Sequence, residues 1–238
     1  ERFYKADNVV ISVAGNVSEE LIEKIIAHFS RLERSHMEKK LIQPPFLTER
    51  IIRQKDTEQA HLCIGFQGLK IGHEDYYSLI VLNNILGGSM SSRLFQEIRE
   101  NRGLAYSVFS YHSAYKDTGM VTIYAGTAPE QLDELYDAIM ITLERLREKG
   151  ITEKELRNSK EQLKGSFMLS LESTNNRMSR NGKNELLLKR HFTLDEILQE
   201  INRVSMEKVN QMIKEIFTDQ FSLSLISPTG KFPKRVKY

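Results

Sequence analysis

Arg99 and Tyr106 are the two side chains whose types and spacing best suit the binding of a peptide. They flank a turn in GGSMSSRLFQEIRENRGLAYS (87–107), which reads as a short helix, a stop at Gly103 and a returning strand. A guanidinium offers five N–H donors and a phenol offers a hydroxyl, which together can hold peptide carbonyl oxygens or a carboxylate. The alternative is that Arg99 bonds the carbonyls at the end of its own helix while Tyr106 packs. The residues alone leave both interpretations open.

The residues around this pair predict how it is positioned. Leu94, Phe95 and Ile98 have the spacing of a buried helix face, which places Arg99 in the last turn. Gly103 lies where a helix ends in a left-handed residue, and Leu104 can then fold back on Ile98. We therefore expect the tips of Arg99 and Tyr106 to lie close together on a concave surface, pointing into open space.

The paired glycines Gly87 and Gly88 precede this helix, at a place where a helix N-terminus can bind phosphate. The GxxxxGK[ST] pattern of a phosphate-binding loop is absent. Two interpretations remain. The glycines let the backbone turn from one helix into the next, or they allow the close approach of a backbone or a peptide to the loop.

The sequence offers no ligand set for a metal. Neither HExxH nor HxxEH occurs, and no two of the six histidines share a helical turn: His28, His36, His61, His73, His112 and His191. We therefore expect this chain to bind no zinc. His61 and Cys63 point to the same face of one predicted strand, but side chains two apart on a strand rarely hold the geometry of a Cys–His nucleophile pair.

Composition excludes several function classes. The chain has 238 residues, 40% of them hydrophobic and 28% charged, with a formal net charge of +2. This balance fits a globular core and gives no reason to expect binding to nucleic acid or to an anionic membrane. The most apolar run, YYSLIVLNNIL (76–86), is too short and too polar to span a bilayer. The single cysteine, Cys63, excludes an internal disulfide and favours a reducing compartment, so we expect a cytoplasmic location.

The first 45 residues are predicted to be the end of one domain. Residues 8–16 have the apolar run of a strand buried on both faces, and Ser18 is placed to cap a helix. Residues 34–46 are charged and then broken by Pro44–Pro45, as in a linker. The chain starts at Glu1 without an initiator methionine, so we expect a fragment: 1–45 is the last strand and helix of a homologous domain plus the linker, and 46–238 is a second domain.

The second domain is predicted to be α+β. Strands are expected at 49–54 and 59–68, a helix at 75–86, a hairpin over 105–126, helices around Gly150 and at 206–217, and a last strand at 221–227. Thr152 and Glu155 form a capping box for one of these helices, and Thr193 and Glu196 repeat it. The order corresponds to a split β-α-β-β-α-β plan, with an antiparallel sheet and helices packed on one face.

The stretch GGSMSSRLFQEIRENRGLAYSVFS (87–110) resembles the C-terminal-domain signature of the insulinase and mitochondrial processing peptidase family, whose members carry an inverted zinc motif. YKADNVVISVAGNVSEELI (4–22) resembles the end of the family's N-terminal domain, and residues 151–182 and 193–217 resemble its late helices. The resemblance covers roughly residues 3 to 230 and is nearest to the small bacterial processing proteases.

The resemblance implies a division of labour between two halves around a closed chamber. An HxxEH helix and a later Glu in the N-terminal domain hold zinc, and an Arg and a Tyr seven residues apart in the C-terminal domain hold the substrate backbone near it. Arg99 and Tyr106 match that spacing. The implied substrate-binding residues are Arg99, Tyr106, Gly87 and Gly88. Zinc is expected in the intact protein, with no ligand in this chain. The expected partners are a peptide substrate, the missing N-terminal domain and a second full-length copy.

Three functions follow as expectations. The first is the substrate-holding half of a zinc endopeptidase that encloses and cleaves unfolded peptides, with this fragment alone inactive. The second is a catalytically inactive core subunit that binds peptides for an active partner. The third is a structural or assembly domain without a peptide site.

Overall fold

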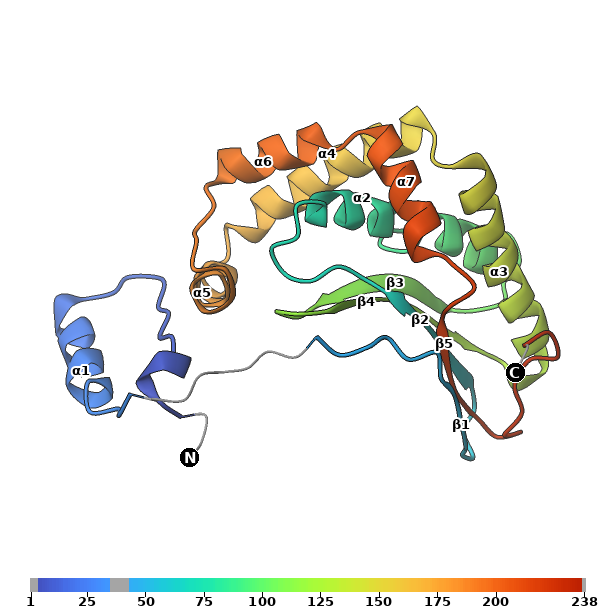
Figure 1. Cartoon of the computed structure of the whole chain (residues 1–238), viewed down its shortest axis with the longest axis horizontal. Helices are drawn as coiled ribbons and strands as arrows, with labels where there is room; N and C mark the ends of the chain where they lie inside the picture. Colours follow the sequence, from blue (N-terminus) through green and yellow to red (C-terminus); the bar gives the residue numbers. More distant parts are fainter. Residues whose placement is uncertain (1–3, 35–42, 237–238) are drawn as a thin grey trace. The chain divides into compact units, whose positions relative to one another are not determined.

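The structure is a computed structural model that describes residues 4–34 and 43–236 (Figure 1). Backbone contacts divide these residues into two compact units. One holds the described residues up to 34 together with Lys164–Leu198, and the other holds Gln43–Leu163 and the residues from Gln199 onward. The assignment of residues 1–45 to the end of a preceding domain stays a prediction.

The larger unit contains a five-stranded sheet, and the α+β fold is confirmed. The strands are β1 (Arg50–Gln54), β2 (Ala60–Gln67), β3 (Ser107–Ala114), β4 (Gly119–Thr127) and β5 (Ser222–Ser227), in the order β1-β5-β2-β4-β3. The pairs β2–β4, β2–β5 and β3–β4 are antiparallel, as predicted.

Strand β1 departs from the predicted antiparallel sheet. It pairs in parallel with β5, in a register that runs from Arg50 opposite Leu223 to Gln54 opposite Ser227. Because β5 lies between β1 and β2, residues 55–59 connect two strands that are not neighbours. The short connection suggested adjacent strands, but the partner of β1 comes from the far end of the chain.

Helices α2 (Tyr76–Leu86), α3 (Leu132–Lys149) and α7 (Met206–Ile216) cover one face of the sheet (Figure 1). Burial alternates along the first part of β2, where Leu62 and Ile64 are fully buried and His61 and Cys63 on the other face are not. Phe66 is 1% exposed, and its ring meets that of Phe217 edge-on at 5.1 Å. The core of this unit therefore lies between the sheet and the helices.

Local signals set the helix ends as predicted. Helix α3 ends at Gly150, whose φ is 67°. Helix α4 (Glu153–Ser170) begins at a complete capping box, in which the amide of Thr152 donates to Glu155 at 2.7 Å and the amide of Glu155 donates to the Thr152 hydroxyl at 3.2 Å. Thr193 and Glu196 repeat this arrangement before α6 (Leu194–Arg203).

The smaller unit corrects one prediction. Residues 8–16 were expected to form a strand buried on both faces, but within the described residues this segment pairs with no strand, and η1 (Ala6–Asn8) is a turn of 3-10 helix. Ile11 and Val13 are 42% and 43% exposed. An apolar run forms a strand only where another strand can satisfy its backbone. Here Ser12 instead donates through its hydroxyl to the carbonyl of Met178 at 2.7 Å.

Helix α1 (Glu19–Phe29) is confirmed in the smaller unit, and Ser18 accepts from the amide of Leu21 at its start. The same unit holds α5 (Thr174–Lys183) and the π-helical η4 (Asn184–Leu188). Most of the predicted linker at residues 34–46 lies outside the described residues. None of the described helices is long and apolar enough to cross a membrane.

Candidate functional site

The segment that carries Arg99 is wound more loosely than an α-helix. It is α-helical at Arg93 and Leu94 and continues as the π-helix η2 (Phe95–Glu100), in which the amide of Asn101 donates to the carbonyl of Gln96 at 2.9 Å. Leu94 and Ile98 are fully buried and fix the segment to the core. Single π-helical turns are rare and are often found at functional sites.

The turn after this segment forms as predicted. Gly103 has a φ of 62°, in the left-handed region, and its amide donates to the carbonyl of Arg99 at 3.2 Å. The amide of Leu104 donates to the carbonyl of Ile98 at 2.9 Å, and both side chains belong to the core. These two bonds close the helical segment and return the chain toward β3.

The structure brings Arg99 and Tyr106 into direct contact. Nη1 of Arg99 donates to the backbone carbonyl of Tyr106 at 3.0 Å, and the guanidinium carbon lies 4.3 Å from the centre of the Tyr106 ring. The ring of Phe95 lies 4.9 Å from the same carbon. Tyr106 is 75% exposed, so it does not pack into the core. The pair therefore meets by stacking at the surface, whereas the sequence predicted that only the tips would converge.

This arrangement leaves Arg99 able to bind a ligand. Besides the Tyr106 carbonyl, its nearest anionic contact is Glu100, whose carboxylate lies 3.9 Å from Nε. One hydrogen bond and one long ion pair do not use up five donors. The exposed Tyr106 ring adds a flat surface and a hydroxyl next to them. The two residues together can receive carbonyl oxygens or a carboxylate.

Gly87 and Gly88 are explained by the close approach of their own chain. A Cβ atom at Gly87 would lie 2.5 Å from the amide nitrogen of Ser110, and one at Gly88 would lie 2.9 Å from Cα of Asn84. The amide of Ser110 in β3 donates to the carbonyl of Gly87 at 3.0 Å. At Gly87 the geometry favours the close approach of a backbone, that of β3, and the contact of the two glycines with a peptide stays a prediction.

The other candidate groups do not assemble into a site. Burial raises the pKa of the Cys63 thiol, which disfavours the reactive thiolate. Nδ1 of His61 instead makes a 2.9 Å hydrogen bond with the hydroxyl of Tyr124. Within residues 4–34 and 43–236, no three His, Cys, Asp or Glu side chains are placed to hold a metal ion. The described residues therefore do not fit a zinc site.

Two features of this region were not predicted from the sequence. One is the Phe95 ring beside Arg99, although its position four residues earlier on the same helix was a signal. The other is an ion pair between Arg93 and Glu155, in which the two residues are 62 positions apart. Glu155 was recognised only as part of a capping box, and nothing local marks Arg93 as its partner.

Comparison with known proteins identifies the family of the chain. The family model for the peptidase M16 inactive domain matches residues 1–163. The chain is 58% identical to "Uncharacterized zinc protease YmxG" of Bacillus subtilis over 231 residues, which are 97% of this chain and 56% of that protein. It is 34% identical to an "Uncharacterized zinc protease" of Mycobacterium tuberculosis, with 96% of this chain and 54% of that protein covered.

A solved structure supports the same assignment. The crystal structure of a peptidase M16 inactive domain from Pseudomonas fluorescens superposes with a TM-score of 0.84 at 25% identity, covering 98% of this chain and 56% of that one. The chain therefore spans about half the length of the curated relatives that it matches.

Proposed function

Because this chain belongs to the peptidase M16 inactive-domain family, we propose that it is the substrate-holding half of a zinc-dependent endopeptidase that encloses and cleaves unfolded peptides. One observation carries the proposal: half-buried Arg99 stacks on exposed Tyr106, seven residues away, at the end of a helical segment that Leu94 and Ile98 fix to the core. A partly exposed cation and an exposed phenol held in one geometry suit a peptide backbone that is recognised without regard to its sequence.

In this proposal, Arg99 donates to carbonyl oxygens of the bound peptide, and the hydroxyl of Tyr106 donates to another acceptor nearby. Both interactions are with backbone groups that every peptide has, so they position the peptide without selecting its side chains. Gly87 and Gly88 support the turn from which the helical segment starts. Holding a substrate in one orientation lowers the entropic cost of reaching the transition state.

Zinc belongs to the other half of the protein in this proposal. The relatives named zinc proteases are almost twice as long as the matched region, and the described residues of this chain offer no ligand set. No step assigned to this chain therefore passes through the metal. The proposed partners are the N-terminal half, a peptide substrate and a second full-length copy, and the proposed location is the cytoplasm.

The description of the family as an inactive domain favours a second function. An inactive core subunit would use the same Arg99–Tyr106 pair to bind peptides for an active partner. The third function, a structural or assembly domain, would leave the exposed pair without a ligand.

The experiment that separates these functions uses the full-length natural protein. Its zinc content is measured by mass spectrometry, and its hydrolysis of a fluorescence-quenched pool of unstructured ten-residue peptides is followed with and without a chelator. The proposal predicts about one zinc per chain and hydrolysis that the chelator abolishes. Binding of the peptides without hydrolysis would favour the inactive subunit, and neither binding nor hydrolysis would favour the structural domain.

A further inference from the structure

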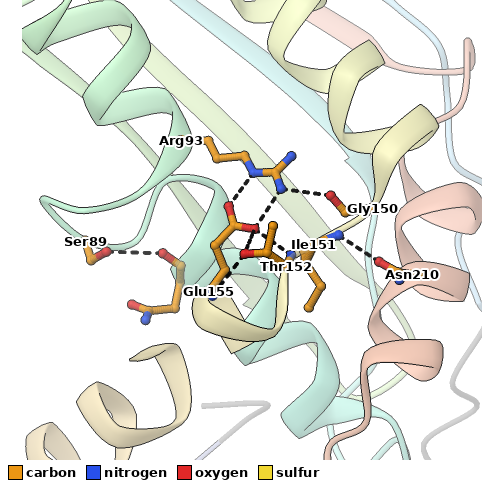
Figure 2. A network of polar contacts seen from close by, with 8 residues as sticks. Ser89, Arg93, Gly150, Ile151, Thr152, Glu155 and Asn210 are labelled. Carbon is orange, nitrogen blue, oxygen red and sulfur yellow. Dashed lines mark hydrogen bonds and ion pairs between the residues drawn. The ribbon is translucent and has the colours of Figure 1, made fainter. Parts of the chain in front are cut away.

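Arg93, the first residue of the helical segment, makes three hydrogen bonds to residues far from it in the sequence. Its Nε donates to one carboxylate oxygen of Glu155 at 2.7 Å, and its Nη2 donates to the other at 2.8 Å (Figure 2). Nη2 also donates to the carbonyl of Gly150 at 2.8 Å. The Arg93 and Glu155 side chains are 22% and 28% exposed, so water only partly screens the pair. A two-pronged pair of this kind fixes direction as well as distance.

Glu155 is itself held in place by the turn between α3 and α4. One of its oxygens accepts from both the amide and the hydroxyl of Thr152, at 2.7 and 2.9 Å. The amide of the preceding residue, Ile151, donates to the side chain of Asn210 in α7 at 2.9 Å (Figure 2). Arg93 is therefore attached to a turn that is already bound to a third helix.

Helix α4 also holds the end of α2, from which the loop with Gly87 and Gly88 starts. The side-chain amide of Asn84, near the end of α2, donates to Ser159 at 3.0 Å and to Gln162 at 3.2 Å, both in α4. The hydroxyl of Ser159 donates to the carbonyl of Val81 at 3.3 Å. The loop of residues 87–92 thus lies between two positions that are fixed to α4, one through Asn84 near its start and one through Arg93 at its end.

We propose that Arg93 and Glu155 are positioning residues that hold the helical segment 93–103 in the orientation that presents Arg99 and Tyr106 to a peptide. The proposal rests on the proposed function. Arg93 begins the helical segment whose last turn carries Arg99, and Leu94 and Ile98 between them are buried. A rotation of the segment at Arg93 would therefore move Arg99, and a small displacement of a substrate-holding group is costly for the reaction.

Two substitutions test the pair without removing its neighbours. Arg93→Lys keeps the charge but loses the fork that binds both oxygens of Glu155. Glu155→Gln keeps an acceptor for Thr152, because glutamine also serves in a capping box, but it removes the charge that faces Arg93. If Arg93→Lys fails to fold, Glu155→Gln carries the test.

The chain contains a matched control. Arg190 donates to Glu196 at 2.9 Å, and Glu196 closes the second capping box with Thr193. An arginine again pairs with the glutamate of a capping box, here through one hydrogen bond and with side chains 62% and 40% exposed. The three residues are neighbours in sequence, and the pair lies in the other unit. Arg190→Lys and Glu196→Gln therefore make the same substitutions at an ion pair outside the unit that carries Arg99.

The experiment measures kcat/KM of the full-length protein on the quenched peptide pool, in the natural background and in an Arg99→Ala/Tyr106→Phe background. In the natural background, Arg93→Lys and Glu155→Gln are expected to lower kcat/KM about tenfold. In the second background, they are expected to change it less than about twofold, because a positioning residue has nothing left to position. The control variants are expected to stay within about twofold of their parents.

Two results would overturn the positioning role. Either Arg93→Lys and Glu155→Gln leave kcat/KM unchanged in the natural background, or they lower it by the same factor in both backgrounds. If Arg99→Ala/Tyr106→Phe itself hydrolyses peptides as fast as the natural protein, the proposed function fails first and the positioning role fails with it. Circular dichroism and zinc content of each variant separate these results from a loss of folded protein.

Discussion

Arg99 contacts both the backbone and the ring of Tyr106. Its Nη1 donates to the Tyr106 carbonyl at 3.0 Å, and its guanidinium carbon lies 4.3 Å from the centre of the Tyr106 ring. The contact spans the turn at Gly103 and joins the end of the helical segment to the start of β3. It fixes a half-buried arginine and an exposed tyrosine relative to each other before any ligand binds. A preordered pair loses less conformational entropy on binding than two independent side chains would.

The stack itself predicts a stability difference between two Tyr106 variants. Tyr106→Phe keeps the ring beneath Arg99, so the free energy of unfolding should change by less than about 0.5 kcal/mol. Tyr106→Ala removes the ring and should cost about 0.5–1 kcal/mol, the usual size of an exposed cation–π contact. Urea denaturation of both variants measures the difference. Equal stability of the two variants would mean that the stack contributes nothing.

Two glycines with positive φ should respond differently to alanine. At Gly103, with a φ of 62°, no atom lies within 4 Å of an added Cβ, so Gly103→Ala should cost only the left-handed strain of about 1–2 kcal/mol. At Gly150, with a φ of 67°, the added Cβ would lie 2.5 Å from Oδ1 of Asn210, which accepts from Ile151. Gly150→Ala should therefore lower the thermal midpoint more. The reverse order would contradict the backbone assignment of these turns.

Phe66 and Phe109 provide a test of the core. Phe66 is 1% exposed between Phe217 and Phe221, so Phe66→Ala should lower the free energy of unfolding by about 3–5 kcal/mol. Phe109 is 43% exposed on β3, and Phe109→Ala should cost much less. Denaturant titration of the two variants is the measurement. A larger loss at Phe109 would show that the helices cover the opposite face of the sheet.

His112 predicts a dependence of stability on pH. Burial lowers its pKa below the ordinary value of 6.5, and the bond from Nε2 to the carbonyl of Leu69 opposes this only in part. Below pH 6.5 the unfolded chain takes up the proton more readily than the folded one. The stability that comes from keeping His112 neutral in the folded protein is therefore fully present above pH 6.5. It decreases as the pH falls toward the pKa of His112 in the folded state.

Substitution of His112 by Gln should flatten that dependence. The slope that a single histidine can contribute is at most about 1.4 kcal/mol per pH unit. The free energy of unfolding of the natural protein and of His112→Gln is compared at intervals from about pH 7 to 5. A parallel decline of the two proteins would assign the pH dependence to other groups.

The sequence predicted those parts of the fold that depend on neighbouring residues. The stop at Gly103, the capping boxes at Thr152 and Thr193, and the end of α3 at Gly150 are all set by conformational preferences within a few positions. The parallel pairing of β1 with β5 joins segments about 170 residues apart, for example Arg50 with Leu223, and left no local signal. The π-helical winding at 95–100 was missed for a similar reason, since residue spacing predicts helix but not its pitch.

The candidate site was predictable only in part. The types and spacing of Arg99 and Tyr106 suggested that the two side chains meet, and they do. How they meet depends on the carbonyl of Tyr106, and a sequence does not reveal where a backbone carbonyl points. Residues 8–16 show a different kind of error: an apolar run was interpreted as a strand, although no described strand pairs with it.

The central claim is that Arg99 and Tyr106 hold the peptide. Arg99→Ala and Tyr106→Phe are introduced separately into the full-length protein. Two controls accompany them: Arg203→Ala removes an exposed arginine paired with Glu200, and Tyr115→Phe alters a tyrosine that is 59% exposed. All four variants should keep the natural zinc content and circular dichroism.

Hydrolysis of the quenched peptide pool by these variants is the most direct test. The loss of one hydrogen bond, or of one charge-assisted bond, costs about 1–3 kcal/mol, so kcat/KM should fall roughly five- to hundredfold, more for Arg99→Ala than for Tyr106→Phe. The controls should stay within about twofold. Unchanged hydrolysis by an Arg99→Ala/Tyr106→Phe double variant, with natural zinc content, would contradict the claim.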